Sequence, residues 1–134
     1  MNSNISYWIL ASASALSFFG LGLAGMSGFS ALAQGTAEGT IVSMAKGSQS
    51  ADNPEFYVPA ETAVKAGETV TWKNDDTAIH TATSGKDATP DGRFDTSLVS
   101  PGQGSKPITM PSEPGQYPYL CTLHPWMEGT ITVT

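Results

Sequence analysis

Short apolar runs separated by clusters of turn residues constrain the fold of this chain most. After Ala33 no stretch sustains the 3.6-residue apolar spacing that is typical of an amphipathic helix. Instead, β-branched and aromatic residues gather in short runs that alternate with segments rich in Gly, Pro, Ser and Asp, and this pattern predicts an all-β sandwich of two sheets. The predicted strands are 40–44, 55–59, 69–73, 81–83, 107–110, 117–120 and 130–134.

Two of these runs also predict which faces are buried. Val70 and Trp72 alternate with polar neighbours, and the run 130–134 alternates in the same way, so each has one face toward a core. Residues 84–105 are rich in Gly, Ser, Asp and Pro, and we expect them to form a long loop.

The N-terminal segment differs in composition from the rest of the chain. Residues 1–33 contain no Asp, Glu, Lys or Arg and end in Ala31-Leu32-Ala33, which fits the small-x-small rule for signal-peptide cleavage. The stretch lacks a basic residue near Met1 and is long enough to span a bilayer, so a retained anchor stays open beside a cleaved signal. We expect a signal peptide or membrane anchor over 1–33 and a β domain over 34–134, which lies outside the cytoplasm with either alternative.

The charged residues indicate which partners the β domain disfavours. All twelve acidic and six basic residues follow Ala33, so the domain carries the whole formal charge of −6. This balance argues against nucleic acid and anionic membrane surfaces as partners. It favours solubility and leaves open an attraction to a basic protein.

One cysteine, two histidines and a methionine form a conspicuous set. Cys121, His124 and Met127 follow each other at three-residue steps in the loop between the last two predicted strands, and His80 lies upstream in another loop. The chain has no other Cys or His, so an internal disulfide is impossible. A thiolate, two imidazoles and a weakly held thioether are the ligands of a mononuclear electron-transfer copper site.

Other interpretations of the same residues are weaker. Zinc binds Cys and His but rarely uses Met, and iron–sulfur clusters need more thiolates. A Cys–His nucleophilic pair is a further alternative, although a Met at the same step is unusual for it. Taken singly, a Cys or Met is most often core packing. Their joint occurrence favours copper.

From about Thr40 to Val133 the sequence also resembles a known family, the cupredoxins or small blue copper proteins, closest to the amicyanin and plastocyanin-like group. The two-residue gap between His124 and Met127 is similar to that of amicyanins, and Trp126 stands where amicyanins often carry Phe. The segments that carry the resemblance are Asn74-Asp75-Asp76, His80-Thr81, Arg93 to Leu98, Pro101-Gly102, Glu113 to Tyr117 and Cys121 to Met127.

The resemblance implies a Greek-key β-sandwich that holds one type 1 copper ion, cycling between Cu(I) and Cu(II), with Met127 as the axial ligand. It implies that Asn74 ties the His80 loop to the Cys121 loop through Thr122, and that backbone N–H groups near Cys121 bond its sulfur.

The resemblance also implies how electrons enter and leave. His124 would emerge through an apolar patch formed with Pro125 and Trp126 and extended by Leu98 or Leu123, where redox proteins dock briefly. The implied function is that of a monomeric, non-catalytic electron carrier between extracytoplasmic redox partners.

Three alternatives to a free carrier remain. A copper-trafficking protein would have an open, Met- or His-rich site, whereas Met44 and Met110 lie in predicted strands. An enzyme would need a second copper site or further His ligands. A domain held to a larger complex by a retained N-terminal helix would keep the same site.

Overall fold

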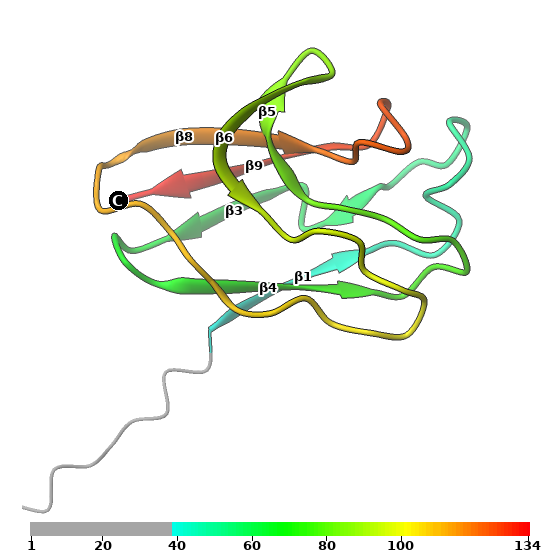
Figure 1. Cartoon of the computed structure of the whole chain (residues 1–134), viewed down its shortest axis with the longest axis horizontal. Helices are drawn as coiled ribbons and strands as arrows, with labels where there is room; N and C mark the ends of the chain where they lie inside the picture. Colours follow the sequence, from blue (N-terminus) through cyan, green and yellow to red (C-terminus); the bar gives the residue numbers. More distant parts are fainter. Residues whose placement is uncertain (1–38) are drawn as a thin grey trace, which may run out of the picture. The chain divides into compact units, whose positions relative to one another are not determined.

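Residues 39–134, the part of the chain that the computed structural model describes, form a sandwich of two β-sheets (Figure 1). The prediction of an all-β, two-sheet fold is therefore confirmed, while the predicted signal or anchor over 1–33 and the domain start at 34 lie outside the described residues. Within residues 39–134 no helix is long and apolar enough to cross a membrane. The strands are β1 (Thr40–Met44), β2 (Tyr57–Val58), β3 (Glu61–Val64), β4 (Thr69–Asn74), β5 (Thr83–Lys86), β6 (Thr89–Asp95), β7 (Ile108–Thr109), β8 (Gly115–Leu120) and β9 (Glu128–Val133).

Both sheets mix parallel and antiparallel pairs. One sheet has the order β2-β1-β4-β7 with β1 parallel to β4, and the other has the order β3-β9-β8-β5-β6 with β3 parallel to β9. In the second sheet β8 runs antiparallel to both β9 and β5. The end of β8 therefore lies beside the start of β9 and the start of β5, and the loops at these three points meet at one end of the sandwich.

The core lies between the sheets, on the faces that the alternation predicts. Trp72 of β4 is fully buried, and its ring centroid lies 5.4 Å from that of Tyr119 on β8 in a T-shaped arrangement. Such a pair stabilises the fold by about 0.5–1.5 kcal/mol beyond the area that it buries. Alternate residues of the central strands complete this core, namely Val42, Met44, Val70, Tyr117, Ile131 and Val133.

Three strands depart from the sequence prediction. The segment 84–105, expected to be a long loop, contains most of the β5–β6 hairpin, and β3 was not predicted at all. The sequence of β6 is polar and includes Pro90 and Gly92, and Phe94 is its one buried residue. An edge strand of this kind needs no apolar alternation, because only one of its residues contacts the core.

Gly129 provides a test of the packing between β8 and β9. It pairs with Tyr119, and a Cβ at this position would lie 2.5 Å from the Tyr119 ring. We expect Gly129→Ala to lower the free energy of unfolding by about 1–3 kcal/mol, because the buried ring must move. Urea unfolding measures this change. Gly104→Ala is the matched control, since its Cβ would meet no atom closer than 3.7 Å, and it should shift stability by less than about 0.5 kcal/mol. Equal losses in both variants would contradict this account of the packing.

Candidate metal centre

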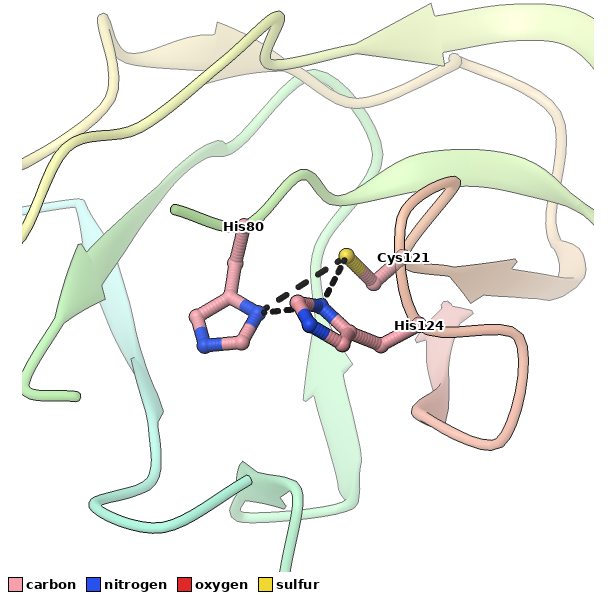
Figure 2. A group of neighbouring side chains, drawn as sticks. All are labelled: His80, Cys121 and His124. Carbon is pink, nitrogen blue, oxygen red and sulfur yellow. Dashed lines mark hydrogen bonds between the residues drawn. The ribbon is translucent and has the colours of Figure 1, made fainter. Parts of the chain in front are cut away.

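Three of the four predicted ligands converge at the end of the sandwich where these loops meet. Figure 2 shows the side chains of His80, Cys121 and His124 turned toward one another. The sulfur of Cys121 lies 3.8 Å from Nδ1 of His80 and 3.6 Å from Nδ1 of His124, and the two Nδ1 atoms are 3.1 Å apart. His80 and Cys121 are fully buried, whereas His124 is partly exposed.

The loop after β8 explains why ligands spaced three residues apart share one side. The N–H of His124 donates to the carbonyl of Cys121 at 3.3 Å, and the N–H of Met127 donates to that of His124 at 2.8 Å. The N–H of Cys121 in turn donates to the carbonyl of Met127 at 3.1 Å, which closes the loop. Two successive turns therefore return the chain to the same side at each ligand position.

His80 is fixed by a different backbone contact. It forms an isolated antiparallel bridge with Val99, with hydrogen bonds of 3.2 and 2.8 Å in the two directions. This bridge holds the residue just before β5, beside the end of β8. The two imidazoles thus reach the site from separate segments that are each held by main-chain hydrogen bonds.

The spacing of the donor atoms fits a bound transition-metal ion, and their kind fits copper. In zinc sites such nitrogens lie about 2.0 Å and such a sulfur about 2.3 Å from the ion, and three donors held around one ion at these distances would lie about 3.5–3.8 Å from one another. The three observed separations of 3.1, 3.6 and 3.8 Å are close to this range. One thiolate with two imidazoles is the strong-ligand set of a type 1 copper site.

Met127 lies at the end of the same loop. Its side chain is fully buried and belongs to the same core cluster as Cys121. Its role as the axial ligand stays a prediction.

The Cys121 sulfur accepts a backbone hydrogen bond of the kind that the family resemblance implied. The donor is the N–H of Thr81, at 3.3 Å. Thr81 also joins the two ligand loops through its side chain, because its Oγ1 accepts the N–H of Thr122 at 3.0 Å. A hydrogen bond to a thiolate sulfur draws electron density from it and so helps to set the reduction potential of a bound metal.

Asn74 organises the His80 loop, but its bonds differ from those expected. Its amide donates to the carbonyls of Ala78 and Val99, at 2.8 Å each, and its Oδ1 accepts the N–H of Asp76 at 2.9 Å. Among residues 39–134 its side-chain hydrogen bonds do not include one to Thr122. Thr81 makes the link to the Cys121 loop instead.

Asp76 and Ser48, whose roles the sequence did not predict, surround the other nitrogen of His80. Nε2 of His80 lies 2.8 Å from Oδ2 of Asp76 and 3.3 Å from Oγ of Ser48. Asp76 stands four residues before His80, but nothing in this local spacing distinguishes it from an ordinary loop carboxylate. The partner segment that holds it, residues 47–49, is far away in the sequence.

Backbone donors hold the Asp76 carboxylate in its charged form. Burial alone would raise the pKa of Asp76, but hydrogen bonds to the carboxylate lower this pKa well below its usual range. The donors are the N–H groups of Gly47, Gln49 and Thr77, at 2.7–3.0 Å, and the His80 ring.

The exposed side of the site is aromatic and apolar. The ring of Trp126 lies 5.4 Å from that of His124 at 63°, and its indole N–H donates to the carbonyl of Ser48 at 3.1 Å. Burial lowers the pKa of His124, and the neighbouring His80 lowers it further. Trp126 is 40% exposed, and other large apolar side chains in the loops of this region are exposed as well, namely Ile79, Leu98 and Leu123.

Comparison with known proteins agrees with this geometry. Residues 42–134 match the family of copper binding proteins described as the plastocyanin/azurin family. Over 77 residues the chain is 35% identical to amicyanin from Paracoccus versutus, and this match covers 58% of the chain and 57% of the length of that amicyanin.

Solved structures show the same fold. A purple cupredoxin from Nitrosopumilus maritimus aligns with a TM-score of 0.65 and 28% identity, over 71% of this chain and 99% of that one. A reduced Cu(I) form of an amicyanin variant aligns with a TM-score of 0.56 and 27% identity, over 72% of this chain and 83% of that one. The family match spans the whole sandwich from β1 onward and includes the convergent cysteine and both histidines, so the chain belongs to the plastocyanin/azurin family of copper-binding proteins.

Proposed function

We propose that this protein carries single electrons through one copper ion held by His80, Cys121 and His124, with Met127 as the axial ligand. The observation that carries the proposal is the convergence of one sulfur and two Nδ1 atoms, all within 4.8 Å of one another. Each ligand segment is fixed by backbone hydrogen bonds, so its donor atom moves little when the charge of the metal changes. A small structural change between Cu(I) and Cu(II) favours fast electron transfer.

The same residues support a carrier in preference to an enzyme. The chain contains one Cys and two His, and this site uses all three. A catalytic copper needs an open position or further imidazoles, and the chain has no other imidazole to offer. Copper trafficking is the alternative, but a trafficking site exchanges its ion readily, whereas Cys121 and His80 are fully buried.

Electron exchange in this proposal occurs through His124. Its ring is partly exposed beside Trp126, and Pro125 between them is exposed, so these three residues form the docking patch. Exposed Leu98 and Leu123 would extend its apolar surface. Redox proteins would bind there briefly, because a small apolar contact without a strong anchor dissociates fast.

The location of the protein is part of the same proposal. The uncharged segment 1–33 supports export by a signal peptide or an anchor, with the copper domain over 34–134 outside the cytoplasm. We infer a monomer that meets its electron donor and acceptor there.

A visible spectrum tests the proposed copper site. Adding Cu(II) to the purified protein should produce an intense thiolate-to-copper charge-transfer band at about 600 nm. Cys121→Ser should abolish the band, because the hydroxyl that replaces the thiolate cannot supply this transition. Cys121 is the chain's one thiol, so the band also reports which residue supplies it. A colourless wild-type protein that binds Zn(II) in preference to copper would refute the proposal.

Two substitutions of Met127 test the axial role. Met127→Gln should keep the band and lower the midpoint potential, because an amide oxygen stabilises Cu(II) more than a thioether does. Met127→Leu should keep the band and raise the potential, since it removes the axial donor and keeps the apolar volume. Spectroelectrochemistry measures both values. Shifts of the same sign, or none, would show that Met127 does not contact the metal.

A further inference from the structure

The two nitrogens of the His80 ring face different environments. Nδ1 points toward Cys121 and His124, whereas Nε2 points away from them toward Asp76 and Ser48. The side chains of His80 and Asp76 are 0% and 1% exposed, so no solvent competes for this contact. A carboxylate can only accept a hydrogen bond, and Nε2 must therefore carry the ring proton. That proton position leaves the lone pair on Nδ1, the atom that faces the metal site.

We propose that Asp76 is the positioning residue of the copper centre: it holds the Nε2–H of His80 so that Nδ1 binds the ion, and its charge favours Cu(II) over Cu(I). This inference rests on the ligand set of the proposed function. Carboxylates that accept the outer N–H of a ligating histidine fix the ring and make its other nitrogen a stronger donor. Because Cu(II) bears the higher charge, a nearby negative charge stabilises it more than it stabilises Cu(I).

Several hydrogen bonds hold the carboxylate of Asp76 in place. The N–H of Gly47 donates to Oδ1 at 2.8 Å. The N–H of Gln49 donates to Oδ2 at 3.0 Å, and the hydroxyl of Ser48 donates to the same oxygen at 3.3 Å. An ionised carboxylate removed from water destabilises a fold unless such donors surround it. Residues 47–49 therefore form a cradle for Asp76, and the carboxylate has little freedom to leave His80.

Asp75 provides a matched control next in the sequence. Its carboxylate faces outward, where it contacts Lys73 and accepts the Ser43 hydroxyl at 2.6 Å, and its side chain is 39% exposed. Asp75→Asn and Asp76→Asn remove the same charge one residue apart. They differ in burial and in contact with His80.

The experiment compares copper affinity and midpoint potential in the wild type, Asp76→Asn and Asp75→Asn at one pH near neutrality. Asp76→Asn should lose about 10–100-fold in Cu(II) affinity, the usual effect of removing such a partner, and lose less in Cu(I) affinity. Each tenfold loss that is selective for Cu(II) raises a one-electron potential by about 59 mV. Asp75→Asn should shift the potential far less, because water and salt screen its charge. Asp76→Glu, which restores the charge, should return the potential toward the wild-type value.

Separate outcomes overturn the two proposals. A wild type without the copper band refutes the proposed function, whatever Asp76 does. A wild type with the band, and an Asp76→Asn variant whose potential equals that of the wild type or of Asp75→Asn, refutes the role of Asp76 alone.

A measurement on the wild type covers the case in which Asp76→Asn does not fold. Proton–nitrogen NMR of the diamagnetic Cu(I) protein should show a slowly exchanging proton on Nε2 of His80. A His80 ring with no proton on Nε2, or with one that exchanges as fast as that of partly exposed His124, would overturn the inference.

Discussion

The antiparallel pairing of β5 with β8 is the contact on which the metal centre depends. Thr83 pairs with Leu120, so the residues before β5 lie beside the residues that follow β8. One step farther along, the N–H of Thr81 reaches the sulfur of Cys121, and Oγ1 of Thr81 accepts the N–H of Thr122. A one-residue slip of β8 would turn every side chain of the strand to the opposite face of the sheet and separate His80 from the cysteine.

The register is itself secured by the core, which links the site to the stability of the whole sandwich. β8 also pairs with β9 over its full length, and Tyr117 and Tyr119 point from it into the core beside Ile131 of β9. Slippage of β8 would therefore expose two aromatic side chains and lose their burial, which costs several kcal/mol. The register of β8 is therefore held by core burial and not by the metal ligands. Because the ligands do not have to stabilise the fold, the site can keep a geometry that suits the chemistry of the ion.

The sequence predicts the ligands better than it predicts the groups around them, for a physical reason. Cys121 and His124 stand out because thiolate and imidazole are rare in this chain and because the three-residue spacing between them matches one turn of the loop. Asp76 is one of twelve acidic residues, and its role arises from the cradle at residues 47–49, a tertiary contact that no local pattern encodes. The amide of Asn74 could be recognised as important. Its hydrogen-bond partners could not, because they include the carbonyl of Val99, whose position is set by the tertiary fold.

Strand prediction fails in a related way. Buried strands such as β4 and β9 alternate apolar and polar residues because one face contacts the core. In β6 that constraint is almost absent, since six of its seven residues are exposed, and its polar sequence is indistinguishable from a loop. Backbone pairing with β5 alone defines it as a strand.

The two histidines have unequal surroundings. In the proposed carrier this difference gives each histidine a separate role. His80 is sealed from solvent and held by a charged, hydrogen-bonded carboxylate, so it suits the tuning of the metal's potential. His124 is partly exposed and packs against Trp126, so it suits contact with a partner. Ser48 connects the two halves, because its hydroxyl approaches Nε2 of His80 while its carbonyl accepts the Trp126 indole N–H. Ser48, which lies between β1 and β2, thereby restrains His80 directly and His124 through Trp126. In the proposed carrier these contacts limit how far either histidine moves when an electron arrives.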